Sequence, residues 1–133
     1  MRRLLGLAFV VALASPAAAE EWSCPGSLLT VDQPAAPEGY TPQPAESTHG
    51  FRYVSFFDGP PANEIELAPS EDRNEGRTLQ VWAFEPGRQQ PITAICRYQD
   101  TNATISIDLA PAITSCTAVW ASEEATAPSL ACK

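Results

Sequence analysis

The sequence predicts a mainly β protein: a small antiparallel β-sheet or sandwich of about six to seven strands, with one short helix after Pro61 and two disulfides. Three observations lead to this prediction. Residues 51–57 form the densest aromatic stretch and have the composition of a strand. Residues 104–109 alternate strictly between polar and apolar side chains. Four cysteines lie in a short chain that starts with an export signal.

The first 19 residues are predicted to be a secretory signal peptide that is removed from the folded protein. Arg2 and Arg3 form its charged start, residues 4–13 form its apolar centre, and small residues lead to a cleavage site after Ala19. No later apolar stretch is long enough to cross a bilayer. We therefore expect residues 20–133 to be one soluble domain that is periplasmic or secreted.

The first strand is predicted over residues 24–31, and a Pro-rich surface loop is expected over residues 32–50, because proline disrupts strand pairing and helices. The next strand covers residues 51–57. Apolar residues fall on both of its faces, with Phe51 and Tyr53 on the same side. This strand is therefore expected to lie inside the sheet and to be covered on both sides.

An Asp-Gly-Pro-Pro turn at residues 58–61 ends that strand, and a short helix is predicted over residues 62–68, since proline is tolerated in the first turn of a helix. Residues 70–76 are predicted to be a solvated loop. The remaining strands are expected over residues 77–84, 91–98, 104–109, 113–120 and 129–132.

The predicted strand register favours one disulfide pairing. A turn at residues 101–102 places Ile107 opposite Cys96, and a hairpin centred on Glu124 places Cys116 opposite Cys132. In a meander Cys96 and Cys116 are two strands apart, about 10 Å, which is too far for a bond. We therefore prefer the pairs Cys24–Cys96 and Cys116–Cys132, although connectivity cannot be deduced from a single sequence.

The motifs resemble those of an uncharacterised family of small exported, four-cysteine proteobacterial proteins. The resemblance rests on Cys24-Pro25, Phe56 to Pro61 (Phe-Phe-Asp-Gly-Pro-Pro), Trp82 with Phe84, Cys96-Arg97-Tyr98, Cys116 and Cys132. It covers nearly the whole chain after the signal peptide. It implies a periplasmic, disulfide-bonded single domain, and it implies no particular activity.

The charge balance is acidic. Without Arg2 and Arg3, six basic residues remain against 16 acidic ones. Such a surface repels nucleic acid and favours a basic periplasmic or envelope protein as partner. The candidate interaction surface consists of acidic residues after the predicted helix start and one tyrosine of the Pro-rich loop: Glu64, Glu66, Glu71, Asp72, Glu75 and Tyr40. The simpler interpretation of these acids is a solvated face.

No catalytic constellation is visible in the sequence, so we expect no enzymatic activity, no cofactor and no metal. His49 is the single histidine, it lies in the predicted loop, and no CxxC motif accompanies it. Arg97 is predicted on the face opposite Cys96. Its simpler role is a surface ion pair, and the second alternative is the centre of an interface.

The leading hypothesis is a non-enzymatic interaction module of the inhibitor or immunity type that docks on a basic partner, such as a cell-wall hydrolase or a toxin. The alternative is a glycan or small-molecule binder, or a glycan hydrolase that uses two carboxylates. A structural accessory of the envelope is the third possibility.

Overall fold

A computed structural model of the chain describes residues 21–74, 77–121 and 129–133. The predicted signal peptide, and with it the cleavage site, lies outside these residues. The described elements are β1 (Ser27–Asp32), β2 (Ala45–Asp58), the 3-10 helix η1 (Pro61–Asn63), β3 (Glu71–Asn74), β4 (Arg77–Ala83), β5 (Ile92–Tyr98), β6 (Thr104–Asp108), β7 (Ser115–Ala121) and β8 (Ser129–Cys132). Within the described ranges, no helix has the length and apolar character that crossing a membrane requires.

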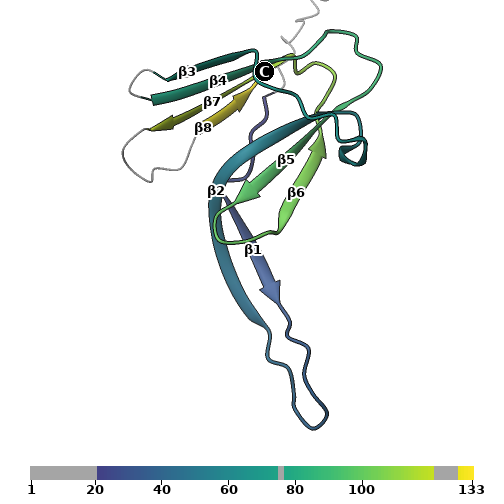
Figure 1. Cartoon of the computed structure of the whole chain (residues 1–133), viewed down its shortest axis with the longest axis vertical. Coiled ribbons are helices and arrows are strands. Elements are labelled where there is room, and N and C mark those ends of the chain that lie inside the picture. The colour runs from purple at the N-terminus through teal and green to yellow at the C-terminus, as the bar shows by residue number, and fades with distance from the viewer. Residues whose placement is uncertain (1–20, 75–76, 122–128) are drawn as a thin grey trace, which may run out of the picture.

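The strands form two antiparallel sheets of four strands, ordered β1-β2-β5-β6 and β3-β4-β7-β8 (Figure 1). The sheets share one core. The ring of Phe56 on β2 lies 5.0 Å from the ring of Trp82 on β4 and 5.3 Å from that of Phe84. Burial of such aromatic side chains contributes strongly to stability. The predicted fold class, a mainly β sandwich with two disulfides, is therefore confirmed.

A β-bulge divides the long strand β2 into two parts. Phe51 lies opposite Tyr98 and Tyr53 lies opposite Arg97, so Arg52 is an extra residue on β2. The bulge turns Phe51 to the inner face of the sheet, where Val54 also lies. The prediction that Phe51 and Tyr53 share a face is therefore wrong, because strict alternation fails at a bulge. The predicted burial of the strand holds for residues 54–57.

The expected loop over residues 32–50 is shorter than predicted. Residues 45–50 belong to β2 and pair with β1, from Ser27 opposite Gly50 to Asp32 opposite Ala45. The loop proper is residues 33–44, where the prolines of this region lie. Together β1, this loop and the first part of β2 form a two-stranded arm (residues 27–50) that projects from the sandwich (Figure 1).

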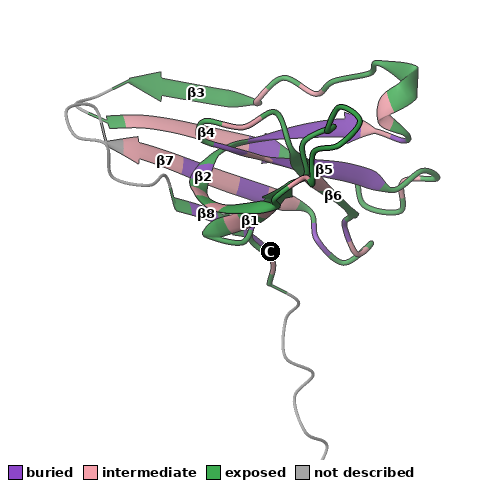
Figure 2. Ribbon diagram, turned by 90° about the horizontal axis from the view of Figure 1, so that it is seen from below, coloured by how far each residue is buried: buried purple, intermediate pink, exposed green. Residues whose placement is uncertain are grey.

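The segment between β2 and β4 also differs from prediction. The expected helix over residues 62–68 is limited to η1, because Glu64 adopts a left-handed conformation with φ 58°. The chain then runs along β2, where the Leu67 N–H donates to the Phe56 carbonyl and the Asp58 N–H donates to the Ile65 carbonyl. The expected loop over residues 70–76 contains β3, which pairs with β4 and is exposed along its whole length (Figure 2).

The hairpin of β5 and β6 has a register two residues away from the predicted one. Cys96 lies opposite Ile105, and Ala94 lies opposite Ile107. Asp100 takes a left-handed conformation with φ 57°, which moves the turn closer to β5. Since a shift of two residues keeps each side chain on its face, Cys96 is still buried, as expected. The predicted meander is wrong, because β6 and β7 lie in different sheets.

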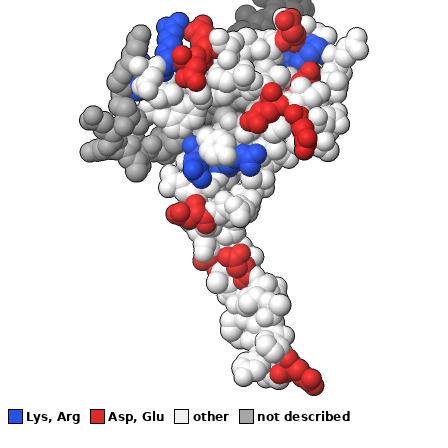
Figure 3. Space-filling view, in the orientation of Figure 1, with Lys and Arg blue, Asp and Glu red and all other residues white. Residues whose placement is uncertain are grey.

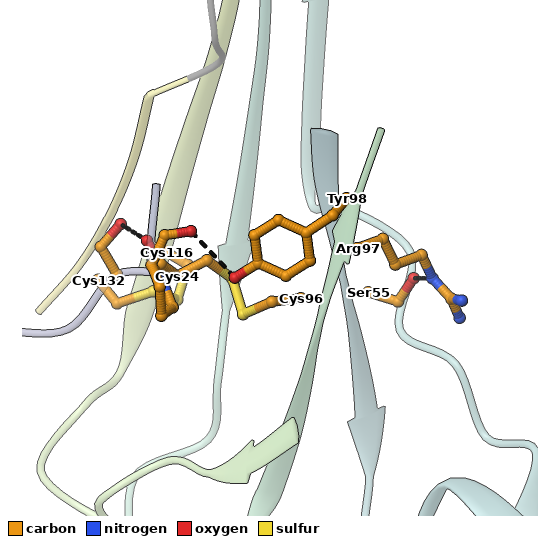
Figure 4. Close-up of a disulfide and its surroundings, with 9 residues drawn as sticks. Cys24, Ser55, Cys96, Arg97, Tyr98, Cys116 and Cys132 are labelled. Carbon is orange, nitrogen blue, oxygen red and sulfur yellow. Dashed lines mark hydrogen bonds between the residues drawn. A yellow bond between two sulfur atoms is a disulfide. The ribbon is translucent and has the colours of Figure 1, made fainter. Parts of the chain in front are cut away.

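The two disulfides are Cys24–Cys96 and Cys116–Cys132, the same pairs that the register argument preferred (Figure 4). Cys116 and Cys132 are directly opposite each other on β7 and β8. The Cys24–Cys96 bond ties the segment before β1 to β5 across 72 residues of chain. It therefore fixes the root of the arm to the sandwich.

Tyr98 provides a second attachment at the root of the arm. Its side chain is 2% exposed, and its hydroxyl donates a hydrogen bond of 3.0 Å to the Pro25 carbonyl (Figure 4). Burial raises the pKa of Tyr98 above its ordinary value, so the hydroxyl stays protonated and can donate.

We expect Tyr98→Phe to lower the free energy of unfolding by about 1 kcal/mol, since one hydrogen bond is lost and the ring stays packed. Urea unfolding measures the change. The control is Tyr53→Phe, whose hydroxyl makes no hydrogen bond within the described ranges and whose removal should change stability by less than about 0.5 kcal/mol. Equal effects of the two substitutions would contradict a role for the bond to Pro25.

Candidate interaction surface

The arm exposes apolar side chains that nothing else in the described chain covers. Leu29 and Val31 are each 59% exposed, and Tyr40 in the arm loop is 73% exposed. Leu29 and Val31 lie on the same face of the arm, opposite Thr48 and Glu46 of β2. Figure 3 shows how far the arm extends from the body. An exposed apolar group of this kind on a projecting element is typical of a protein-binding surface.

The outer edge of β1 is open. β1 ends its sheet, and no described strand pairs with its outer side. Edge strands usually carry charges, prolines or bulges that prevent pairing with other chains. The edge strand β3 follows this pattern with Glu71, Asp72 and Arg73, whereas β1 has Asp32 at its end as its single charge. The backbone of β1 is therefore available to a partner.

His49 holds the arm in place. One ring nitrogen lies 3.0 Å from the Thr30 hydroxyl across the arm, and the other lies 2.8 Å from the Gln99 carbonyl in the turn after β5. The prediction that His49 lies in a loop is therefore wrong, because residue 49 belongs to β2, where it is half-buried. These two bonds join the arm to the turn beside its root, so its direction relative to the sandwich is fixed.

A cationic cluster lies at the root of the arm, on the outer face of β2 and β5. It consists of Arg52, Tyr53 and Arg97, and we call it the root cluster. The guanidinium carbons of both arginines lie 5.6 Å from the centre of the Tyr53 ring. Tyr53 is 38% exposed. The bulge at Arg52 creates this arrangement, because it brings Tyr53 opposite Arg97 on the outer face.

The residues predicted as the interaction surface do not gather in one place. Tyr40 lies in the arm loop, at the end of the molecule far from β3 (Figure 1). The acids Glu64 and Glu66 follow η1, whereas Glu71 and Asp72 lie on β3. Glu75 lies outside the described residues.

Two of these acids have side-chain partners within the chain. A carboxylate oxygen of Glu71 lies 2.7 Å from Nη2 of Arg73, and Asp72 accepts a hydrogen bond of 3.1 Å from the Gln80 amide. Both pairs are exposed, so each contributes little to stability.

The tryptophans serve packing. Trp82 is 5% exposed, and its indole N–H donates to the Leu67 carbonyl. Trp120 is half-buried, and its indole N–H donates to the Arg52 carbonyl. A glycan site that uses an exposed tryptophan therefore cannot use the buried ring of Trp82.

An open hollow of about 330 Å³ is lined by Asp58, Glu85 and Arg88, among others. The guanidinium of Arg88 donates to the carbonyls of Ile113 and Ala110, which makes it part of the fold.

A disulfide-linked β-sandwich with a projecting arm, an open strand edge and an exposed root cluster has the features of a protein-binding module. A family model for the type VI secretion system Tli immunity protein matches residues 44–133. The chain belongs to this family. Membership confirms the expectation of a non-enzymatic, immunity-type interaction protein, and the matched range includes β2 to β8 with the root cluster.

The chain is also similar to a protein of Azospirillum brasilense described as an uncharacterized 16.3 kDa protein in the trpG 5' region. The two are 36% identical over 124 residues, which cover 87% of this chain and 83% of the relative. No solved structure matches the chain.

Sequence reasoning identified Tyr40 as a candidate and Arg97 as a second alternative for an interface, but it missed the rest of the arm and the contacts of Tyr53 with Arg52 and Arg97. A usable signal was present in Leu29 and Val31, two apolar residues that alternate with Thr30 in the predicted first strand. The density of prolines concealed the arm, because all of residues 32–50 was interpreted as loop. No residue type around Arg52 indicates a bulge in place of regular alternation.

Proposed function

We propose that this protein is a periplasmic immunity protein that protects its own cell by binding a type VI effector, and that the arm is its main contact. The observation that carries this proposal is the exposure of Leu29, Val31 and Tyr40 on an arm that the disulfide Cys24–Cys96 and His49 hold in a fixed direction. A fixed arm loses little conformational entropy on binding, so more of its contact energy appears as affinity.

The proposed compartment is the periplasm. Two disulfides are typical of proteins in oxidising compartments, and the predicted signal peptide over residues 1–19 provides export. We propose cleavage after Ala19, so that the mature protein is one domain over residues 20–133.

A finer proposal concerns the charge of the effector. Without the signal peptide the chain has 16 acidic residues against six basic ones, and this negative charge attracts a basic protein over several ångströms and speeds its association. The acidic residues Glu64, Glu66, Glu71, Asp72 and Glu75 contribute to this attraction, in addition to the acids of the arm. Faster association at low salt than at high salt is the expected result.

A competition experiment tests the proposed function. The gene is deleted from the bacterium that encodes it, and the deletion strain is mixed on solid medium with the unmodified strain. We expect recovery of the deletion strain to fall at least about tenfold, because without this protein an incoming effector would meet no inhibitor in the periplasm. The full chain restores recovery, and the mass of the periplasmic protein shows where the signal peptide is removed.

Two controls make the result specific. An attacking strain without a functional type VI system should cause no loss. A chain without residues 2–19, which stays in the cytoplasm, should fail to protect. Equal recovery of the deletion strain and its parent under attack would overturn the proposal.

A further inference from the structure

The root cluster is unusual because, among the described residues, its two arginines form no ion pair although the protein is acidic. The chain has 16 acidic residues against eight basic ones. In the described part of the chain, however, the single ion pair joins Arg73 to Glu71. The guanidinium groups of Arg52 and Arg97 each lie over the ring of Tyr53 instead. Two guanidinium groups on one ring repel each other, and a bound anion removes that repulsion.

Arg97 is held in a defined orientation. Its Nε donates a hydrogen bond of 3.3 Å to the hydroxyl of Ser55, and Ser55 is 5% exposed. Figure 4 shows this contact on the side of β5 away from Tyr98 and the disulfide. Within the described ranges, the two terminal nitrogens of Arg97 and the whole guanidinium of Arg52 donate to no protein acceptor. The two terminal nitrogens of Arg97 are therefore held in one orientation and, within the described ranges, have no hydrogen-bond acceptor.

The root cluster continues the apolar face of the arm. Alternation along β1 and β2 places Ser27, Leu29 and Val31 on the face that also carries Gly50. Phe51 points to the core, so Gly50 points to the outer face, as do Tyr53 and Arg97 beyond the bulge. A partner that covers Leu29 therefore reaches the root cluster next, across the small residues Ser27 and Gly50.

We propose that the root cluster binds a carboxylate of the effector, an Asp or Glu side chain. The free terminal nitrogens of Arg97 donate to this carboxylate, and Arg52, on the same tyrosine ring, adds a second positive charge. This inference rests on the proposed function and adds the chemistry of the contact. Guanidinium groups match a carboxylate with two parallel hydrogen bonds, which a lysine cannot reproduce. The contact also gives specificity, since an effector without the acid leaves two arginines unpaired in the interface.

A protein carboxylate fits this cluster better than a lipid phosphate. The chain carries a net charge of −8, which opposes approach to an anionic membrane surface. The cluster also adjoins apolar side chains on the same face of the arm, as the centre of a protein interface does. A single acidic residue of the effector that contacts the root cluster is compatible with a basic surface elsewhere on the effector.

The test uses the double variant Arg52→Gln with Arg97→Gln in the full exported chain. The effector is the one whose deletion from the attacking strain restores recovery of the strain that lacks this protein. We expect the Gln double variant to bind this purified effector about 30-fold more weakly at 150 mM salt. The double variant Arg52→Lys with Arg97→Lys should regain less than half of the lost affinity, measured as the logarithm of Kd. Lysine keeps the positive charge but cannot form the two parallel hydrogen bonds of a guanidinium group. The matched control is Arg73→Gln with Arg77→Gln, on β3 and β4, with an expected change below about threefold.

The outcomes separate this inference from the proposed function. Wild-type binding by the Gln double variant, together with lost binding by the arm double variant Leu29→Thr with Val31→Thr, overturns the carboxylate site and leaves the immunity function standing. Absence of protection by the unmodified chain overturns the function itself. Binding of the chain to phosphatidylglycerol vesicles that disappears in the Gln double variant overturns the protein-carboxylate assignment. Thermal unfolding of the Gln and Lys variants shows that both are folded before binding is compared.

Discussion

Replacing Cys24 and Cys96 together by alanine lowers the free energy of unfolding by about 4 kcal/mol, against about 3 kcal/mol for the same change at Cys116 and Cys132. The difference arises because the first bond closes a separation of 72 residues and the second a separation of 16. A longer closed loop removes more conformational freedom from the unfolded chain. Urea unfolding of the two double variants measures both values.

The two disulfides also differ in what they hold. Loss of Cys24–Cys96 releases the segment before β1, so amide hydrogens in the arm should exchange faster while those in β7 keep their protection. Loss of Cys116–Cys132 should affect β7 and β8 and leave the arm unchanged. An equal or greater loss of stability for the Cys116–Cys132 variant would contradict the loop-length argument.

Replacing Leu29 and Val31 together by threonine should weaken effector binding on the order of 300-fold and abolish protection in the competition experiment. Threonine is β-branched and suits a strand, so the arm stays folded. It removes apolar surface from the contact and places two hydroxyls where they find no partner. Since both side chains are 59% exposed, the stability of the free protein should change by less than about 1 kcal/mol.

The chain offers a matched control for the arm variant. Ile65 and Ile107 are 50% and 46% exposed, and both lie outside the arm. Replacing these two by threonine makes a comparable chemical change elsewhere on the surface. Binding should change by less than about threefold, the usual range for residues outside an interface. Equal losses for the two double variants would show that the arm is not the main contact.

Much of the fold could be predicted from local patterns. The strict alternation at residues 104–109 identified β6, and the symmetry of the last hairpin about Glu124 placed Cys116 opposite Cys132. Both inferences depend on neighbours in the sequence. The meander failed at Pro111, where the chain crosses between sheets, because Leu109 and Ile113 on either side of that turn are buried in the common core. Which sheet a strand joins depends on distant packing.

The candidate surface was harder to predict than the fold. Charge directed attention to Glu64 and the acids that follow it, yet charged residues on a surface are common and seldom specific. The root cluster depends on Arg52, whose place in a bulge is set by the fit of Phe51 against Tyr98 in the core. Arg97 was predicted, as a second alternative, to lie at the centre of an interface. Tyr53, which contacts Arg97, was predicted on the same face as Phe51, and this prediction was wrong.

The order of the disulfides along the chain bears on how the protein matures. Each cysteine bonds to the next one in sequence, Cys24 to Cys96 and Cys116 to Cys132. A chain that enters an oxidising compartment from its N-terminus presents Cys96 to Cys24 before Cys116 has emerged. Oxidation in order of arrival therefore makes the native bonds directly. Maturation should need a thiol oxidase and no isomerase, since there is no mispaired bond to rearrange.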